Sequence, residues 1–144
     1  MITSWIAKRR IRSDLAKVVQ GDIDSALAKW ADDGVYDFPS NLSVGGTIKG
    51  KKAIADWHYK WFEEFPKRNI IARNIAFAAW PLSPSNVIMI EWTCEETDKE
   101  GREFKYDGVS VLRIKNSKCI QWSDHISFKG LPQISTLIEA SSGT

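Results

Sequence analysis

The chain of 144 residues has few of the side chains that build metal sites or covalent cross-links. It contains two cysteines, Cys94 and Cys119, and two histidines, His58 and His125, and none of these four is paired at the short spacing of metal ligands. We therefore expect no metal and no other cofactor. Both cysteines lie in strand-like segments, where they are predicted to be small buried hydrophobic side chains.

Long hydrophobic runs and an excess of one charge are also missing. No apolar run approaches the roughly 20 residues of a membrane span, and the first residues lack the apolar core and cleavage site of a signal peptide. The 20 basic and 18 acidic residues give a formal net charge of +2, too small to favour nucleic-acid binding. We expect a cytoplasmic protein that binds neither nucleic acid nor a membrane.

The length suits one domain, which we place at residues 1–132, followed by a C-terminal tail at 133–144. Seven tryptophans are the one compositional excess. Aromatic side chains fill cores, and at this abundance they can also line a pocket for an apolar ligand.

Helices are predicted in the first half of the chain. Apolar spacing predicts one over Ile2–Val19, a second that Asp22 caps and that continues through Trp30 to about residue 34, and a third over 51–65. The third carries Trp57 and Trp61 on its apolar stripe. His58 lies one position off that stripe, so we expect it on the helix surface or at a pocket rim.

Strands are predicted for the remainder. A short strand at 35–38 ends at Pro39, the turn-rich segment 41–49 offers a brief hairpin partner, and long strands follow at 70–80, 87–96, 102–114 and 119–128. This order predicts an α+β fold, a cone-shaped barrel of a curved, mainly antiparallel sheet with three helices in the N-terminal half that enclose an apolar pocket.

Asp124 is the one charged residue on an apolar face of the last predicted strand. Alternation places it on one side with Ile120, Trp122, Ile126 and Phe128. A carboxylate among apolar groups either finds hydrogen-bond partners or holds its proton, so a structural role and an acid/base role are both open. His125 should point to the opposite face.

The same alternation predicts which side chains face the pocket. Two registers remain open for the first strand: Tyr36 and Phe38 face inward, or Asp37 joins Asp124 inside as a second carboxylate. The predicted ligand-binding residues are Phe38, Trp57, Trp61, Trp92, Cys94, Tyr106, Ser110 and Trp122. On the outer face, Val109 and Val111 are apolar, which favours a homodimer that covers this face of the sheet.

Three segments resemble the nuclear transport factor 2-like superfamily: WADDGVYDFP at 30–39, KGKKAI at 49–54 and IQWSDH at 120–125. More narrowly, the chain is similar to the SnoaL-like group, which includes polyketide cyclases and has limonene epoxide hydrolase and ketosteroid isomerase as relatives. The resemblance runs from about residue 11 to 128. It implies a cone-shaped α+β barrel, usually a homodimer, with a deep apolar pocket.

The resemblance to limonene epoxide hydrolases makes Asp124 the base that activates a water, and Tyr36 one of the groups that hold this water. Trp92 and Cys94 occupy the positions of the hydrolases' arginine and acidic aspartate, so the group that would protonate an opening epoxide is missing. Steroid isomerases are a poorer match, because their catalytic positions hold Phe38, Ser110 and Asp14 here.

The polyketide cyclases of the group use a single aspartate in an apolar pocket, which is closest to this sequence. We predict cofactor-independent acid/base chemistry on a small apolar substrate, an isomerisation, cyclisation or hydration, with Asp124 and Tyr36 as the catalytic residues. The alternative is a binding module that holds an apolar ligand without chemistry.

Overall fold

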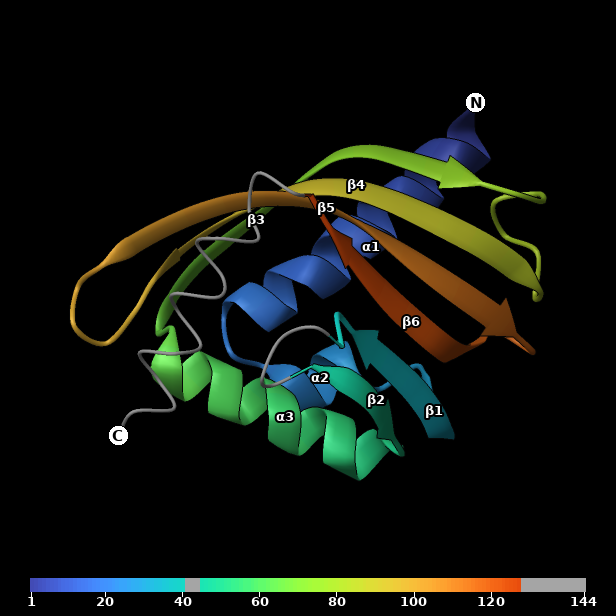
Figure 1. Cartoon of the computed structure of the whole chain (residues 1–144). Coiled ribbons are helices and arrows are strands. Elements are labelled where there is room, and N and C mark those ends of the chain that lie inside the picture. The colour runs from blue at the N-terminus through green and yellow to red at the C-terminus, as the bar shows by residue number, and fades with distance from the viewer. Residues whose placement is uncertain (41–44, 128–144) are drawn as a thin grey trace.

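Three helices lie under one curved sheet, which arches over them (Figure 1). The computed structural model describes residues 1–40 and 45–127. The helices are α1 (Ile2–Val19), α2 (Ile23–Ala26) and α3 (Lys51–Glu64). Within the described part of the chain, no helix is long and apolar enough to cross a membrane.

The sheet has six strands in the order β2-β1-β6-β5-β4-β3. Their bounds are β1 Trp30–Phe38, β2 Gly46–Lys49, β3 Lys67–Phe77, β4 Asn86–Thr97, β5 Glu103–Lys115 and β6 Lys118–Ile126. All neighbours are antiparallel except β1 and β6, which run parallel. The predicted α+β class, three helices and mainly antiparallel sheet are confirmed.

The sheet is open, which corrects the predicted barrel. Its edge strands, β2 and β3, are not hydrogen-bonded to each other. α3 connects these two strands in the chain and lies across the open side (Figure 1), so a helix stands where a barrel would need strand pairing.

The second helix is shorter than predicted. α2 ends at Ala26, and Trp30 begins β1 rather than continuing the helix. Backbone pairing explains the difference: Trp30 aligns with Cys119 of β6, and the Cys119 N–H donates to the carbonyl of Lys29 at 3.0 Å. Hydrogen bonds to a distant strand outweigh the weak local preference of a few residues for helix.

A bulge in β6 corrects one part of the predicted alternation. Ile114 aligns with Cys119 and Arg113 with Gln121, so Ile120 is the extra residue of β6. Ile120 is therefore exposed, although alternation predicted it on the inner face, and Cys119 is buried, as predicted for both cysteines. Phe128, the predicted domain end at residue 132 and the tail at 133–144 lie outside the described residues.

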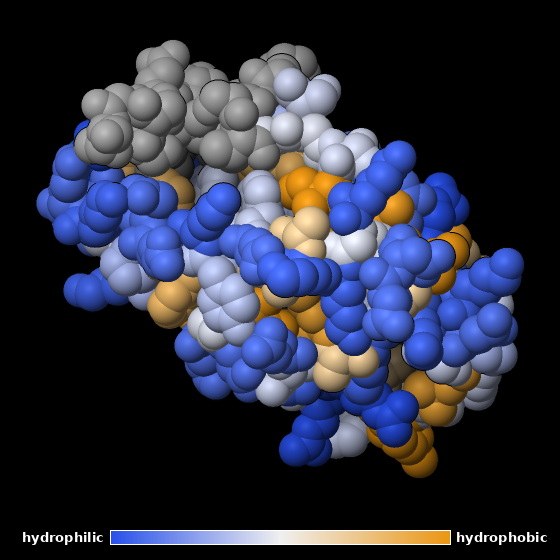
Figure 2. Space-filling view, turned by 90° about the horizontal axis from the view of Figure 1, so that it is seen from below, coloured by the Kyte–Doolittle hydropathy of each residue, from blue (hydrophilic) through white to orange (hydrophobic). Residues whose placement is uncertain are grey.

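The core fills the space between the sheet and the helices. Ile23 of α2, Ile54 of α3 and Ile90 of β4 are completely buried there. On the side that α3 covers, hydrophobic residues reach the surface only in small areas between hydrophilic ones (Figure 2). Burial of apolar surface therefore holds the helices against one face of the sheet.

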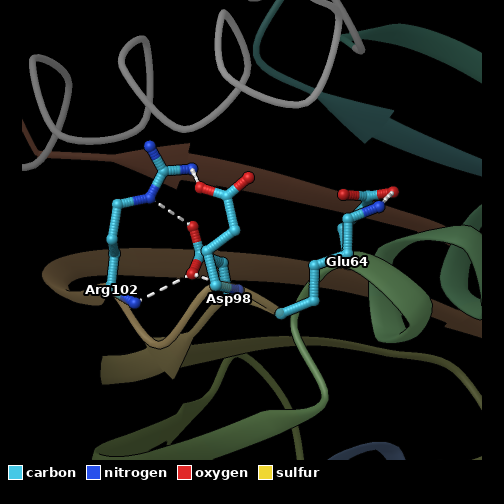
Figure 3. A network of polar contacts seen from close by, with 5 residues as sticks. Glu64, Asp98 and Arg102 are labelled. Atoms are coloured by element: carbon cyan, nitrogen blue, oxygen red, sulfur yellow. Dashed lines mark hydrogen bonds and ion pairs between the residues drawn. The ribbon is translucent and has the colours of Figure 1, made fainter. Parts of the chain in front are cut away.

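The turn between β4 and β5 is tied to the end of α3 (Figure 3). Buried Asp98 accepts hydrogen bonds from the Arg102 N–H at 2.8 Å and the Arg102 Nε at 2.7 Å. The neighbouring Lys99 Nζ donates to Glu64 Oε1 at 2.9 Å, and the Lys99 N–H donates to the Glu64 carbonyl at 3.0 Å. These contacts hold the turn of the long hairpin against the helix.

Replacement of Asp98 should destabilise this turn. We expect Asp98→Asn to lower Tm by about 5 °C, because charge-assisted hydrogen bonds to Arg102 are lost. Burial acts to raise the pKa of Asp98, but the hydrogen bonds from Arg102 outweigh it and the pKa is lowered. The stabilisation should therefore be present above the unfolded-state pKa near ~4 and be lost as pH falls through the lower folded-state pKa.

Thermal unfolding followed by circular dichroism at several pH values measures this effect. Glu100→Gln is the matched control, because Glu100 forms an exposed ion pair with the same Arg102. An equal loss of Tm in the two variants would contradict the role of Asp98.

Candidate functional site

One cavity of about 110 Å³ lies between the concave face of the sheet and the helices. Its volume is below the ~150 Å³ of a cavity that accommodates benzene, so the largest ligand it suits has one ring. The cavity is lined by every predicted site residue: Tyr36, Phe38, Trp57, Trp61, Trp92, Cys94, Tyr106, Ser110, Trp122 and Asp124. The structure brings these residues together, while their roles in binding or catalysis stay predictions.

Asp124 lies in the cavity wall and accepts three hydrogen bonds. Tyr36 donates from its hydroxyl to Oδ2 at 2.6 Å, Ser110 from Oγ to Oδ1 at 2.5 Å, and Trp122 from Nε1 to Oδ1 at 2.7 Å. Strand register positions the donors, because Tyr36 aligns with Trp122 across β1 and β6, and Ser110 with Asp124 across β5 and β6. Two distant parts of the chain thus meet at one carboxylate.

Burial dominates the electrostatics of this carboxylate. It raises the pKa of Asp124, and the hydrogen bonds from Ser110, Tyr36 and Trp122 act in the opposite direction without cancelling it. Burial, and then the charge of Asp124, also raise the pKa of Tyr36 well above its usual value, so Tyr36 remains a hydrogen-bond donor. A carboxyl group with raised proton affinity that faces a cavity can accept and return a proton.

Trp92 and a close-packed glycine position Ser110. The Trp92 Nε1 donates to the Ser110 Oγ at 2.8 Å, which leaves the Ser110 hydroxyl proton for Asp124. The Trp92 ring packs directly on Gly108: a Cβ there would lie 2.6 Å from the ring and 2.7 Å from the backbone oxygen of His125. Gly108 is therefore needed for this placement of the Trp92 indole.

The register of β1 decides between the two open alternatives for Asp37. Tyr36 and Phe38 are buried and face the cavity, whereas Asp37 lies on the outer face. There it accepts hydrogen bonds from Thr47 at 2.8 Å and from Gln121 at 2.7 Å. Slight burial acts to raise the pKa of Asp37, but its hydrogen bonds lower it, as suits a structural carboxylate. Asp124 has no second carboxylate from β1 beside it.

His58 lines the cavity from α3, which fits the predicted place at a pocket rim and excludes the alternative on the helix surface. Its ring packs 5.2 Å from the Tyr36 ring, and Trp57 packs 5.1 Å from the same ring, because α3 turns both neighbours toward β1. Burial, and then the charge of Arg68, lower the pKa of His58 to about 3, so the imidazole is neutral at physiological pH. His125 is exposed on the opposite face of β6 from Asp124, as predicted.

The cavity also contains a buried ion pair that was not among the predicted site residues. Arg68 Nε lies 2.9 Å from Glu96 Oε1, with side chains 5% and 1% exposed. Glu96 also accepts hydrogen bonds from Trp61 Nε1 at 2.7 Å and from the Tyr106 hydroxyl at 2.9 Å. If the alternation is extended by two residues beyond Cys94, it places Glu96 on the inner face. If β3 is started two residues earlier than predicted, it includes Arg68. The strand pattern could therefore have identified both residues.

Among residues 1–40 and 45–127, no group of histidine, cysteine and acidic side chains is placed to hold a metal ion. Burial, and then the charge of Glu96, raise the pKa of Cys94, so its thiol stays protonated and is a poor ligand or nucleophile. The polar groups of the cavity are therefore suited to hydrogen bonding and proton transfer.

The chain belongs to the SnoaL-like domain family, whose model matches residues 14–122. Uncharacterized protein YesE of Bacillus subtilis (strain 168) is 21% identical over 117 residues, which are 80% of this chain and 77% of YesE.

Solved structures show the same fold. An NTF2-like protein of unknown function from Burkholderia pseudomallei K96243 has a TM-score of 0.75 at 17% identity and covers 94% of this chain and 99% of its own. A protein with a ketosteroid isomerase-like fold from Catenulispora acidiphila DSM 44928, in complex with trimethylamine, has a TM-score of 0.68 at 16% identity, with 84% and 87% covered.

Removal of one donor should change the proton affinity of Asp124. We expect Ser110→Ala to raise the pKa of Asp124 further, because a hydrogen bond to the charged form is lost. Carboxyl ¹³C chemical shifts followed over pH measure it, and Asp124→Asn assigns the resonance. Ser123→Ala is the control, since Ser123 contacts Asp37 on the outer face. An unchanged or lower pKa in Ser110→Ala would refute the assigned hydrogen bond.

The ionised side chain of Asp124 should lower the free energy of unfolding at neutral pH. Its folded-state pKa is raised, so its contribution is most favourable below the unfolded-state pKa near ~4 and is lost as pH rises through the folded-state value. We expect Asp124→Asn to match the unchanged protein in Tm near pH ~3 and to exceed it increasingly toward pH ~8. A Tm difference that shrinks as pH rises would show that the carboxylate is stabilised by its three donors instead.

Proposed function

We propose that this protein is an enzyme that moves a proton on a small, largely apolar substrate, without a cofactor. Asp124 is the single acid/base, and Tyr36 is the donor that orients a substrate oxygen or a water. One observation carries the proposal: the carboxylate of Asp124 faces an aromatic cavity, and its burial there raises its pKa.

Proton transfer at carbon fits this site better than the opening of an epoxide. One carboxylate can take a proton from an acidic carbon and return it at another position, as isomerisation and cyclisation require. Epoxide opening calls for a second acid, and Trp92 and the protonated thiol of Cys94 occupy the positions where related hydrolases hold theirs. Glu96 is held by Arg68, Trp61 and Tyr106.

Deuterium exchange tests this chemistry without a known product. The protein is incubated in D₂O with a panel of one-ring ketones, and loss of the proton next to the carbonyl is followed by ¹H NMR. We expect acceleration by the unchanged protein and a loss of about 10²–10⁴-fold in Asp124→Asn, because the base is removed.

Asp37→Asn is the matched control, because it removes a carboxylate from the outer face of the same sheet. Its exchange rate should equal that of the unchanged protein. Exchange that survives in Asp124→Asn would exclude Asp124 as the base, and exchange lost equally in both variants would show a general effect on the fold.

A non-catalytic binding module is the second candidate. Its support is that the three donors from Tyr36, Ser110 and Trp122 satisfy Asp124 without a substrate. The Catenulispora acidiphila relative, solved with trimethylamine, shows that a protein of this fold holds a small molecule. Ligand binding without Asp124-dependent exchange for any ketone of the panel would favour this second candidate.

The outer face of the sheet supports the proposal of a homodimer. Met89 and Ile71 are both 45% exposed there, and Val111 aligns with Met89. Single exposed apolar residues are common, but the alignment of Met89 with Val111 on one sheet face suits a partner with the same surface.

Replacement of Met89 should break this interface. We expect the unchanged protein to have twice the chain mass in light scattering after size exclusion, and Met89→Lys to shift toward the monomer, because a charge would be buried against the partner. Lys105→Gln, which alters an exposed ion pair with Glu95, is the control. A dimer that persists in Met89→Lys would place the interface elsewhere.

A further inference from the structure

Arg68 is a buried guanidinium that the protein leaves short of acceptors. Its side chain is 5% exposed, and its Nε lies 2.9 Å from Glu96 Oε1 without the alignment of a hydrogen bond. The hydrogen bonds formed by the described residues include none from a terminal nitrogen of Arg68. A guanidinium has five N–H donors, and buried donors without acceptors are costly.

Glu96 does not complete this site, because its own oxygens are already engaged. Trp61 Nε1 and the Tyr106 hydroxyl donate to its two oxygens, at 2.7 and 2.9 Å. Trp61 also packs against Arg68, with 5.9 Å between the guanidinium carbon and the ring. The surroundings therefore hold the guanidinium in place and leave its terminal donors for a ligand.

Arg68 and Asp124 lie at different points of the same cavity. Ser110 aligns with Asp124 on one side and with Ile90 of β4 on the other. Glu96, the partner of Arg68, lies six residues further along β4 than Ile90, which is roughly 20 Å of extended strand. Both groups act on Tyr36, which donates a hydrogen bond to Asp124 and whose pKa the charge of Arg68 lowers in part. A ligand in the cavity can thus be held at two ends.

We propose that Arg68 binds the carbonyl or carboxylate oxygen of a one-ring ligand whose other end faces Asp124. Planar oxygen acceptors match the fork of a guanidinium, which binds carboxylates through parallel hydrogen bonds. The neutral imidazole of His58 adds a polar group to the same wall without competing for the negative charge.

This inference names the substrate class of the proposed enzyme, and the following step rests on the proposed proton transfer by Asp124. When Asp124 takes a proton from the carbon next to a carbonyl, the C–H electron pair forms a C=C bond and the carbonyl π pair moves onto oxygen. The proton neutralises Asp124 and the negative charge passes to this carbonyl oxygen on the Tyr36 side of the cavity, so the total charge of the cavity is unchanged, while Arg68 holds a second oxygen at the far end of the ring. Arg68 thus orients the ring with its reacting carbon at Asp124.

Three ring compounds of equal size test the assignment: benzoate, benzamide and benzylamine. Binding is measured by calorimetry and by the ¹⁵N resonances of the Arg68 guanidinium. We expect benzoate and benzamide to bind and to shift these resonances, and benzylamine to bind at least tenfold more weakly than benzoate. Benzylamine binding as tight as benzoate, or no saturable benzoate binding at ~10 mM, would overturn the proposal.

Variants separate the guanidinium from a general effect of charge. Arg68→Lys keeps the positive charge but loses the planar pair of donors, and it should weaken benzoate binding by about tenfold or more. Arg68→Gln with Glu96→Gln removes the buried pair together and avoids an unpaired carboxylate. Arg73→Gln removes an arginine from the outer face of the same strand and should leave benzoate binding unchanged. Unchanged benzoate affinity in both Arg68 variants refutes the inference.

Asp124→Asn distinguishes failure of this inference from failure of the proposed enzyme. Benzoate should bind at least as tightly to this variant, because a negative charge leaves the cavity. If ketone exchange does not depend on Asp124 while benzoate still depends on Arg68, the enzyme proposal fails alone. If deuterium exchange depends on Asp124 and benzoate affinity does not depend on Arg68, only the proposal of an oxygen-binding site at Arg68 fails.

Discussion

The parallel pairing of β1 with β6 is the contact on which the rest of the site depends. Tyr36 and Trp122 align across this pair, which brings the Tyr36 hydroxyl to Asp124 although the two residues are far apart in the chain. A shift by one residue would send Tyr36 to the outer face and Asp37 into the cavity. The same pairing extends β1 back to Trp30 and ends the preceding helix after a single turn.

The apolar cavity gives its few polar groups their properties. Burial raises the pKa of Asp124 and of Tyr36 and lowers that of His58, so at neutral pH two neutral groups surround one carboxyl group with raised proton affinity. Water would weaken each of these effects, because it solvates charge. Aromatic side chains from the sheet and from α3 therefore contribute to the chemistry by excluding water as well as by contacting a ligand.

Strand alternation was enough to find Asp124 and its apolar neighbours, because each side chain's face depends only on its position within one strand. Alternation did not predict the right face where a strand contains a bulge, or the right residues where the predicted ends of a strand differ from the observed ends. The bulge at Ile120 reversed one end of β6, and the late predicted start of β3 hid Arg68. The place of His58 stayed open between the helix surface and the pocket rim for a related reason: helical spacing gives a stripe, whereas the angle at which α3 packs on β1 decides how wide a stripe faces the cavity.

The sequence by itself determined the α+β class, the order of helices and strands, and the identity of the carboxylate on an apolar face, since these follow from local periodicity. Tertiary structure alone decided that the sheet stays open, that Tyr36 rather than Asp37 meets Asp124, and that Arg68 and Glu96 form a second polar centre in the cavity. Each of these depends on contacts between residues distant in the chain, whose register no local pattern specifies.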